Sequence, residues 1–376
     1  MVPALPNLRR TALVVVCAFG LSWALVLWAS ARANGGTGPI DGDPFVFRAW
    51  THWDADWYAA IAKTGYSYSA TQQSPVAYFP LYPMVIRALT WLGLSAYVAG
   101  VLLTVASGAI ALWVFSRWAR RLSTPLQAEW GLLTLALYPF SVFLFGAMYS
   151  DALFLMLVVL AFDALERDDV VLATFIGALA TACRPVAPAV VCGLLVRRLE
   201  LRRAKGEALT PYDFIPVFAG AGLGLYMLFL YASFGDPVAF VHAQGADGWG
   251  HVPGWETWFK KEFFMTFTRI SLVSVVAVRF VAHAGFTLLA LALVWPIRKR
   301  LGWGYAVYVA MAVGIPALSS KDLHGLGRYV IAAFPCFLVG AMMLSARPKL
   351  MKGALAVGLL GQAAVAWLLG SHHYVA

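Results

Sequence analysis

Residues 47–82 read FRAWTHWDADWYAAIAKTGYSYSATQQSPVAYFPLY and come soon after the first long apolar stretch of the chain. Two carboxylates, Asp54 and Asp56, stand among tryptophans in this stretch. Acidic side chains are costly in and beside a bilayer, so a strongly apolar chain retains few of them and they are often functional. These two acids therefore define the first candidate site.

The aromatic spacing in the same region predicts helices. Trp50, Trp53 and Trp57 recur at three- and four-residue intervals, which predicts a helix over Pro44–Lys63 lying in the membrane interface with its aromatic face toward the headgroups. A second interfacial helix is expected over Phe79–Trp91, where a proline near the first turn costs no hydrogen bond. The loop is therefore expected to be ordered and helical.

The composition excludes a soluble protein. Of 376 residues, 61% are hydrophobic and 12% are charged, and the mean hydropathy is +0.75. Soluble domains are about 45–50% apolar and about 25% charged. The net charge of +10 comes from arginines and lysines clustered in short connections, such as RRLELRRAKG and IRKR. This clustering is typical of the cytoplasmic side of a membrane protein, so a nucleic-acid partner is not expected.

We predict an all-α polytopic membrane protein with a single integral domain, residues 1–376. About eleven apolar segments of near 20 residues are candidate membrane spans. With the N-terminus in the cytoplasm and the first span retained as a signal anchor, the loops 32–95 and 235–270 lie outside the cell membrane. The candidate spans are residues 11–31, 96–118, 127–145, 149–165, 169–183, 186–199, 214–234, 271–295, 303–319, 328–346 and 352–370.

Asp54 and Asp56 cannot serve one pocket from a helix, because side chains two positions apart point to different faces. An acid set among aromatic side chains suits a general base. The alternative is an interfacial acid that faces water. The Asp-x-Asp spacing is similar to a metal-binding motif, but no third ligand is evident.

Two further charged residues stand inside apolar sequence. Asp151, in PFSVFLFGAMYSDALFLM, is either a functional intramembrane acid or, with Ser150, the cap of the helix that follows. Arg184 is followed by Pro185 and Pro188, which break a helix and free backbone groups. An arginine at such a break can grip a phosphate; the alternative is an arginine that snorkels to the headgroups.

The segment SSKDLHGLGRY, residues 319–329, brings Lys321, His324 and Arg328 together before the next span. Two cations and an imidazole suit a phosphate or a phosphate-sugar headgroup. The alternative is an ordinary charged loop in which Lys321 and Asp322 pair with each other.

The second long loop carries FGDPVAFVHAQGADGW, residues 234–249. Its His242, Gln244 and Trp249 are the kinds of side chain that bind sugars; the alternative is a structured cap of the bundle. The His-His pair at 372–373 is taken as tail. The four cysteines have no CxxC or CxxH spacing, so no zinc or disulfide framework is expected. No cofactor is predicted, and a divalent metal remains open.

Six pieces follow one another from about residue 45 to 336: HWDADWYAAIAKTGY, AYFPLYPMVIR, YPFSVFLFGAMYSDALF, ATACRPVAPA, FGDPVAFVHAQ and GRYVIAAFP. In this order the chain resembles the PIG-V family of mannosyltransferases, within the GT-C glycosyltransferase superfamily, in a bacterial form. The resemblance implies a GT-C-type fold, an active site at the outer membrane face, a polyprenyl-phosphate mannose donor and transfer with inversion.

The resemblance also assigns roles. The family's Trp-Asp position falls on Asp54, which is thereby the expected base, with Asp56 in reserve. The family's acid after Tyr-Ser falls on Asp151, where Glu is more usual. Its arginine falls on Arg184, although Pro-Val-Ala here replaces a Ser-Asn-Gly-like run. The expected donor-phosphate ligands are Arg184, Lys321, His324 and Arg328. The residues expected to bind the substrates are Trp53, Tyr58, Asp151, His242, Gln244 and Tyr329.

The expected partners are a polyprenyl-phosphate sugar donor, the lipid bilayer, and an acceptor that is a glycan, a glycolipid or a protein. Two other classes of function compete with this reading. A lipid or solute transporter would place ionisable residues near the bilayer midplane. A non-catalytic assembly subunit would keep the family's shape without needing both the acid and the arginines.

Overall fold

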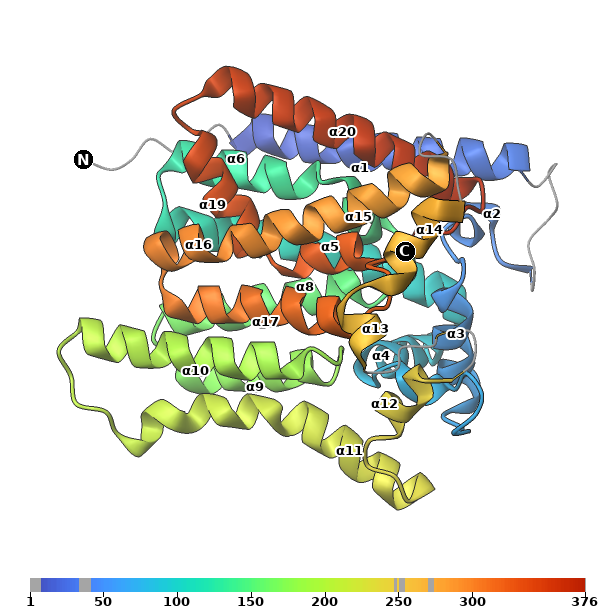
Figure 1. Ribbon diagram of the computed structural model, residues 1–376, viewed down its shortest axis with the longest axis horizontal. Coiled ribbons are helices and arrows are strands. Elements are labelled where there is room, and N and C mark those ends of the chain that lie inside the picture. The colour runs from blue at the N-terminus through green and yellow to red at the C-terminus, as the bar shows by residue number, and fades with distance from the viewer. Residues whose placement is uncertain (1–7, 34–41, 247–248, 250–253, 270–273, 376) are drawn as a thin grey trace.

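The computed structural model of the chain describes residues 8–33, 42–246, 249, 254–269 and 274–375. Across these residues every regular element is helical, as the composition predicts. Residues 34–41 of the first expected loop, parts of the second and residues 271–273 of one expected span lie outside the described residues. The long helices lie side by side in a bundle, with α1 and α20 packed against each other along one side (Figure 1).

The helices of the bundle are α1 (Leu8–Ala33), α5 (Ala96–Leu122), α6 (Pro125–Ala136), α7 (Val142–Phe145), α8 (Asp151–Glu166), α9 (Val170–Thr181), α10 (Ala187–Ala204), α11 (Ala221–Phe234), α15 (Val275–Ala292), α16 (Val294–Leu301), α17 (Trp303–Ser319), α19 (Pro335–Leu344) and α20 (Pro348–Gly370). The shorter helices are α2 (Phe45–Arg48), α3 (Asp54–Thr64), α4 (Leu81–Thr90), α12 (Ala239–Gln244), α13 (Trp255–Trp258), α14 (Lys261–Arg269) and α18 (Leu326–Tyr329). The 3₁₀ segments of the described chain are η2 (Pro75–Ala77), η3 (Pro139–Ser141), η4 (Pro211–Gly220) and η5 (Val330–Ala332).

Each candidate span contains a helix of the bundle. In the described part of the chain, five helices are long and apolar enough to cross a membrane, or up to seven if two bent pairs each count as one span. The chain is thus an all-helical, multi-pass membrane protein, while the count of eleven stays a prediction. The two bent pairs turn by 71° before η3 and by 84° before α19. Each bend falls where a proline, Pro139 or Pro335, opens the next element.

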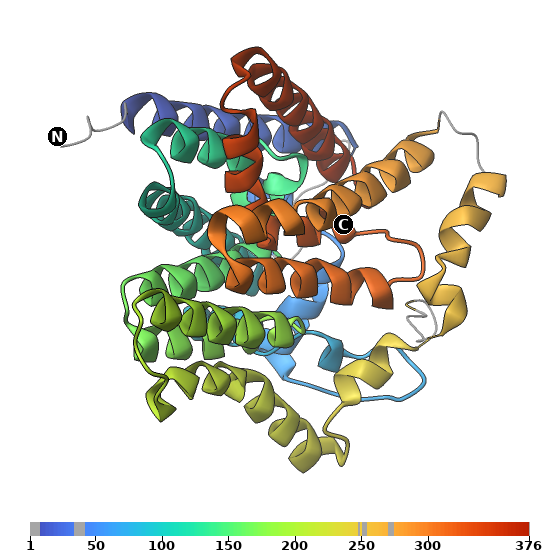
Figure 2. The same cartoon turned by 60° about the vertical axis from the view of Figure 1, so that its left-hand side comes forward.

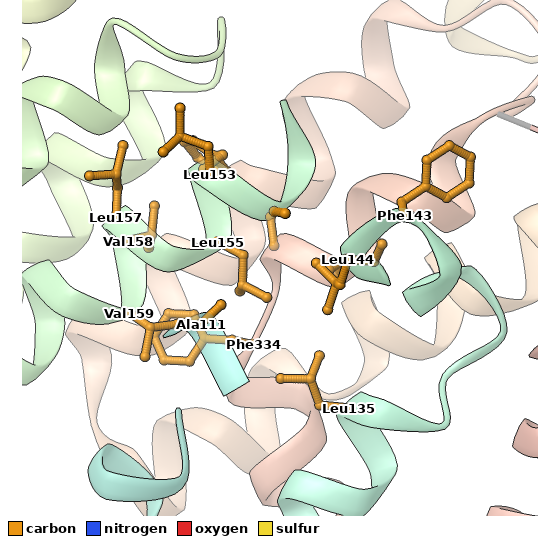
Figure 3. Packing of buried hydrophobic residues seen from close by; sticks show 14 of the residues in the cluster. Ala111, Leu135, Phe143, Leu144, Leu153, Leu155, Leu157, Val158, Val159 and Phe334 are labelled. Atoms are coloured by element: carbon orange, nitrogen blue, oxygen red, sulfur yellow. The ribbon is translucent and has the colours of Figure 1, made fainter. Parts of the chain in front are cut away.

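Helix α8 lies at the centre of the bundle. It is apolar on every side, which is typical of a helix enclosed by others, and nearly all its side chains are buried between α5, α9 and their neighbours. Figure 3 shows its leucines and valines interdigitating with side chains of other elements. The labelled α8 residues are Leu153, Leu155, Leu157, Val158 and Val159, beside Ala111, Leu135, Phe143, Leu144 and Phe334. With 16 residues, α8 spans about 24 Å.

A buried carboxylate lies close to each end of α8. Asp163, near its C-terminal end, is 0% exposed and is held by Arg117 at 2.5 Å, Arg121 at 3.1 Å and Arg167 at 3.4 Å. The arginine-rich ends of α5, α10 and α16 lie at this same end of the bundle, on the side of Figure 1 where α16 and α10 turn. We call it the cationic end. Asp151, at the other end, belongs to the candidate site.

The first loop is helical, but its aromatic residues do not all face the headgroups. The predicted helix over 44–63 is divided into α2 and α3, and Trp50 between them is 0% exposed. Its ring packs against Trp23 at 5.1 Å and against Gly146, where an added Cβ would lie 2.8 Å from the ring. The expectation for Trp50 is therefore wrong, because the bundle supplies the apolar surroundings that the membrane interface was expected to supply.

Candidate active site

Helix α3 begins with an unusual backbone at Trp53. This residue has φ 54° and ψ −104°, a conformation that bulky side chains rarely adopt. Asp54 follows as the first helical residue, and its negative charge suits the N-terminal end of the helix. Gly65, with φ 86°, ends the helix. The turn at Trp53 therefore directs Asp54 out of the loop and toward the bundle.

Asp54 is held by residues from distant parts of the chain. Tyr78 Oη donates to Asp54 Oδ1 at 3.2 Å, and Arg328 Nη1 donates to Oδ2 at 3.3 Å. The backbone N–H of Asp54 points at Tyr149 Oη, 3.5 Å away. The Asp54 side chain remains 21% exposed, so it is fixed in place and still accessible.

Arg328 links Asp54 to a second, deeper acid. Its Nε lies 3.7 Å from Asp151 Oδ2, which is an ion-pair distance too long for a hydrogen bond. Asp151 is paired in turn with Arg184. The four side chains alternate in sign and sum to zero charge, and both arginines and Asp151 are less than a tenth exposed. Buried charges are tolerated when each has an opposite partner, as here.

Aromatic rings flank both guanidinium groups. Arg328 lies 4.5 Å above the ring of Tyr149, and Arg184 lies 4.4 Å above the ring of Tyr329. Such cation–π contacts add attraction when the cation is desolvated. The four charges and these rings form the site that we call the charge relay of Asp54, Arg328, Asp151 and Arg184.

The segment that presents Arg328 depends on two glycines. Gly325 has φ 79°, and a Cβ on Gly327 would lie 2.4 Å from the ring of Phe140. The backbone N–H of Gly327 donates to His283 Nδ1 at 3.0 Å, while its carbonyl accepts from Tyr138 Oη at 2.8 Å. The short helix α18 is thereby clamped from both sides, which sets the direction of Arg328.

Arg184 lies at the predicted helix break. Helix α9 ends at Thr181, and α10 begins at Ala187, after Pro185. The carbonyl freed at Ala182 accepts the N–H of Leu81 at 3.0 Å, so the break is satisfied by the start of α4. The predicted helix break at the prolines is confirmed, and Arg184 beside it is buried. Its guanidinium faces Asp151, however, and is not among the groups that line the open cavity described next.

A cavity of about 420 Å³ opens in front of Asp54. Its size falls in the range of small-molecule sites, about 300–1,000 Å³. It combines aromatic rings with amide, ammonium, carboxylate and imidazole groups. The lining residues are Trp53, Asp54, Trp57, Gln73, Tyr78, Trp249, Lys321, Asp322, His324 and Tyr374.

The cavity brings together Trp53, Asp54, Lys321 and His324, four of the residues expected in the site. Tyr58 is buried beneath, where its hydroxyl donates to Ser150 Oγ at 3.1 Å. Ser150 is the N-cap residue of α8 without a side-chain capping bond, and Asp151 follows in the first turn.

Three of the expected site residues lie outside the cavity. Asp56 accepts from Tyr97 Oη at 2.9 Å, on a different side of α3 from the cavity, as the two-residue spacing predicts. His242 is exposed and paired with Asp236 at 2.7 Å. Gln244 ends α12 and, like His242, is not among the cavity-lining residues. From the second loop the cavity takes Trp249 instead.

The residues of the site that were not predicted include Gln73, Tyr78, Tyr149, His283 and Tyr374. Tyr149 precedes Ser150-Asp151 in the motif already singled out, so its position was the available signal. Tyr78 lies in the run that starts α4. His283 stands alone in an apolar helix, a pattern that more often marks a core residue than a functional one. Tyr374 follows the last span in a segment taken as tail.

Two histidines near the cavity are kept neutral. Burial lowers the pKa of His52 to about 4, with the neighbouring His372 adding to the effect. Burial likewise lowers the pKa of His324 to about 4, and the cations Arg279 and Arg328 act in the same direction while Asp322 opposes them. At neutral pH His324 is therefore a hydrogen-bonding group and not a cation, which leaves Lys321 as the positive charge in the cavity wall.

A metal centre is not evident in the described part of the chain, where no three His, Cys, Asp or Glu side chains gather in a way that could hold an ion. Chemically, the arrangement offers one accessible carboxylate, buried arginines behind it, and a lysine beside it. Such a set can accept a proton from a hydroxyl and stabilise an anion that departs nearby.

Comparisons with known proteins find mannosyltransferases that are similar to part of the chain. No family model matches the chain. It is similar to "GPI alpha-1,6-mannosyltransferase 2" of Homo sapiens, with 32% identity over 145 residues, 36% of this chain and 28% of that protein. It is similar to "GPI mannosyltransferase 2" of Drosophila melanogaster, with 31% identity over 114 residues, 27% of this chain and 24% of that protein. The matched part thus spans about a quarter of each of these relatives.

Among solved structures, the chain has a TM-score of 0.46 to the apo oligosaccharyltransferase of Archaeoglobus fulgidus, at 10% identity, covering 96% of this chain and 56% of that one. A likeness at this level carries no argument about function. The sequence relatives are nevertheless mannosyltransferases, and the similarity to them is partial.

Proposed function

We propose that the protein is an inverting glycosyltransferase, a bacterial PIG-V-like member of the GT-C superfamily. It would transfer mannose from polyprenyl-phosphate mannose to an acceptor hydroxyl. One observation carries the proposal: Asp54 opens onto the polar cavity while Arg328 ties it to the buried Asp151 and Arg184. The partial similarity to mannosyltransferases supports the choice of sugar.

The proposed reaction is a single displacement. Asp54 takes the proton of the acceptor hydroxyl as the acceptor oxygen bonds to the anomeric carbon of mannose. The bond from that carbon to the phosphate oxygen breaks, and its electron pair leaves with the lipid phosphate. Attack from the side opposite the phosphate inverts the configuration. Lys321 in the cavity wall and Arg328 beside Asp54 would stabilise the phosphate as its charge grows.

A second cavity supports a donor with a lipid chain. It has about 520 Å³ and is formed by apolar side chains of α6, α15, α19 and α20. Val330, two residues after Arg328, lines it, and so does Tyr138, whose hydroxyl holds the carbonyl of Gly327. The segment from Gly327 to Val330 therefore has a polar site at one end and an apolar cavity at the other. An isoprenoid phosphate has this same pairing of an anionic head and an apolar tail.

We further propose that the N-terminus is cytoplasmic and that the site faces outward. The support is the positive-inside rule applied to the two ends of the bundle: the cationic end would lie in the cytoplasm, which leaves Asp54 at the outer face. A transporter would need its ionisable groups near the bilayer midplane. The relay instead lies where α8 begins and next to the first loop, which favours the enzyme.

The direct test is Asp54→Asn in purified full-length protein supplied with polyprenyl-phosphate mannose. The amide keeps the shape of the side chain but cannot take the proton. Transfer should therefore fall by at least about a hundredfold, the lower bound of general-base catalysis. Thermal unfolding checks that the variant is folded. Wild-type turnover in a folded Asp54→Asn protein would remove Asp54 from the role of base.

The lipid part of the proposal is tested by filling the apolar cavity. Gly340 lines it, and a Cβ there meets no atom within 4 Å, so Gly340→Leu adds volume to the cavity without a clash at Cβ. Gly314→Leu in α17 is the matched control, since a Cβ at Gly314 is equally unhindered and the residue does not line the cavity. Gly340→Leu should raise the KM for the long-chain donor about tenfold, and Gly314→Leu should not. Equal donor KM values in the two variants would argue against this cavity.

A further inference from the structure

The segment after the last long helix returns to the cavity. Helix α20 ends at Gly370, and the chain turns through Ser371 and His372, whose φ is 60°. The backbone N–H groups of His372 and His373 still bond the last turn of α20, at 3.1 Å to Leu369 O and 2.9 Å to Leu368 O. The turn therefore carries Tyr374 away from the helix and back over the site, beside α15 (Figure 2) and against His324 of the loop after α17.

The returning segment is fastened at several points. The carbonyl of Tyr374 accepts a hydrogen bond from Arg279 in α15, and Val375 is only 2% exposed. The ring of His372 packs edge-on against His52, with 4.4 Å between centroids. These contacts hold the segment to two different parts of the bundle, so Tyr374 is presented in a defined position.

The Tyr374 ring forms part of the cavity wall next to Asp54. It meets Trp53 edge-on at 5.3 Å and stacks on His324 at 5.2 Å with 26° between the planes. It is nevertheless 40% exposed. A ring that is held on two sides and open on the rest has a free surface for a ligand.

A second group of rings lines the same cavity. Trp57 stacks on Tyr78 at 5.7 Å with 19° between the planes, and Trp249 lies 6.0 Å from each of them. Tyr78 is the residue that donates to Asp54. Gln73, Lys321 and Asp322 place polar groups between and beside the rings. The cavity thus has flat apolar faces and a few convergent polar groups, the pattern of a small-molecule site.

We propose that this cavity is the subsite for the pyranose ring of the acceptor, and that Tyr374 is a positioning residue that holds this ring against Asp54. A pyranose has one face of C–H groups, which packs on aromatic rings, and a rim of hydroxyls, which bonds to amide, ammonium and carboxylate groups. The lipid of the donor would lie in the apolar cavity and its phosphate near Arg328 and Lys321, so the aromatic part of the polar cavity is left to the acceptor. This inference rests on the proposed function.

The test compares three variants of the full-length protein: Tyr374→Ala, Tyr374→Phe and, as a control in the same segment, the exposed His373→Ala. The probes are polyprenyl-phosphate mannose as donor and short alkyl α-mannosides as acceptors. Tyr374→Ala should raise the acceptor KM about tenfold and leave the donor KM within about twofold. Tyr374→Phe, which keeps the ring, should recover most of the acceptor affinity. His373→Ala should match the wild type.

Binding can be followed without turnover, because three tryptophans line the cavity and their fluorescence should change when a mannoside enters. In Asp54→Asn the mannoside should still bind, and in Tyr374→Ala it should bind about tenfold more weakly. An unchanged acceptor KM in folded Tyr374→Ala would overturn the inference, as would equal losses for donor and acceptor or no mannoside binding by the wild type.

The two proposals fail separately. If Asp54→Asn is inactive and Tyr374→Ala binds the mannoside normally, only the role of Tyr374 falls. If Asp54→Asn turns over normally, the base assignment falls, whereas the dependence of mannoside binding on Tyr374 is still measured by fluorescence.

Discussion

The two ends of α8 each hold a buried aspartate, and they treat it differently. Asp163 has three arginines around it, with both carboxylate oxygens within 3.1 Å of a guanidinium nitrogen. Asp151 has Arg184 close by, but its second oxygen is 3.7 Å from Arg328, which Asp54 shares. At the Asp163 end, three arginines surround one carboxylate. At the Asp151 end, two arginines and two carboxylates neutralise one another beside an open cavity.

The difference fits a structural role for Asp163 and the proposed function for the charges around Asp54 and Asp151. A carboxylate that has three arginines around it loses little stabilisation when one of them is removed. The cationic end therefore suits anchoring and orientation in the membrane. A cation shared by two acids can exchange one partner for a substrate anion at lower cost. Residue type does not distinguish the two ends, since both are built from aspartate and arginine; the ratio of charges and the access to a cavity do.

The largest expected effect sets Asp54→Asn against Asp163→Asn. Asp54→Asn should lose at least about a hundredfold in transfer with little change in unfolding temperature, because it removes a proton acceptor. Asp163→Asn should lose stability instead, since it leaves three arginines without their shared anion. Transfer assays and thermal unfolding on the same preparations measure both. A larger loss of turnover per folded molecule in Asp163→Asn would break the distinction between the ends.

The next effect compares single arginines. Arg328→Met leaves Asp54 and Asp151 short of positive charge, and removing one partner of a buried pair costs about 3–5 kcal/mol. Arg121→Met leaves Asp163 with Arg117 and Arg167, and the half-exposed arginine should contribute at most about 1 kcal/mol. Denaturant unfolding would measure the two changes. Equal losses of unfolding free energy in the two variants would show that each arginine matters equally to its network.

Lowering the pH should destabilise the end of the bundle that holds the candidate site before it destabilises the cationic end. The folded pKa of His52, about 4, lies below the ordinary 6.5, so the unfolded chain binds a proton that the folded one does not. Stability should therefore fall as the pH drops from about 6.5 to about 4. At the cationic end, hydrogen bonds from Lys205 and Arg198 lower the pKa of Asp168 from 3.8, so its contribution persists until the pH is below that value.

Thermal unfolding between pH 7 and pH 4 checks this order. His52→Gln, which cannot titrate, should reduce the slope in that window, and His324, whose pKa is also about 4, should account for part of the slope that remains. An identical slope in the variant would mean that the histidine is not the group responsible.

The smallest effect is expected for Asp56→Asn. Asp56 bonds Tyr97 on another side of α3 and does not line the cavity. Transfer should stay within about twofold of the wild type, as is usual for a surface substitution. A loss comparable to that of Asp54→Asn would return Asp56 to the site.

Much of this organisation could be predicted from local sequence. The apolar segments locate the bundle helices, the prolines after Arg184 locate the break, and the two-residue spacing separates Asp54 from Asp56. Partners from distant segments could not be predicted, because no local pattern connects Tyr78, His283 or Tyr374 with Asp54. Trp50 shows the same limit, since periodicity marks an apolar face without stating whether lipid or protein covers it.

The relay also sets an order of assembly. Asp151 opens α8 and Arg184, 33 residues later, lies in the connection between α9 and α10, whereas Asp54 and Arg328 are 274 residues apart. During synthesis the inner pair can form early, but Asp54 waits for its cation until nearly nine-tenths of the chain has been made. A nascent chain stalled before Arg328 would therefore hold Asp54 without its cation.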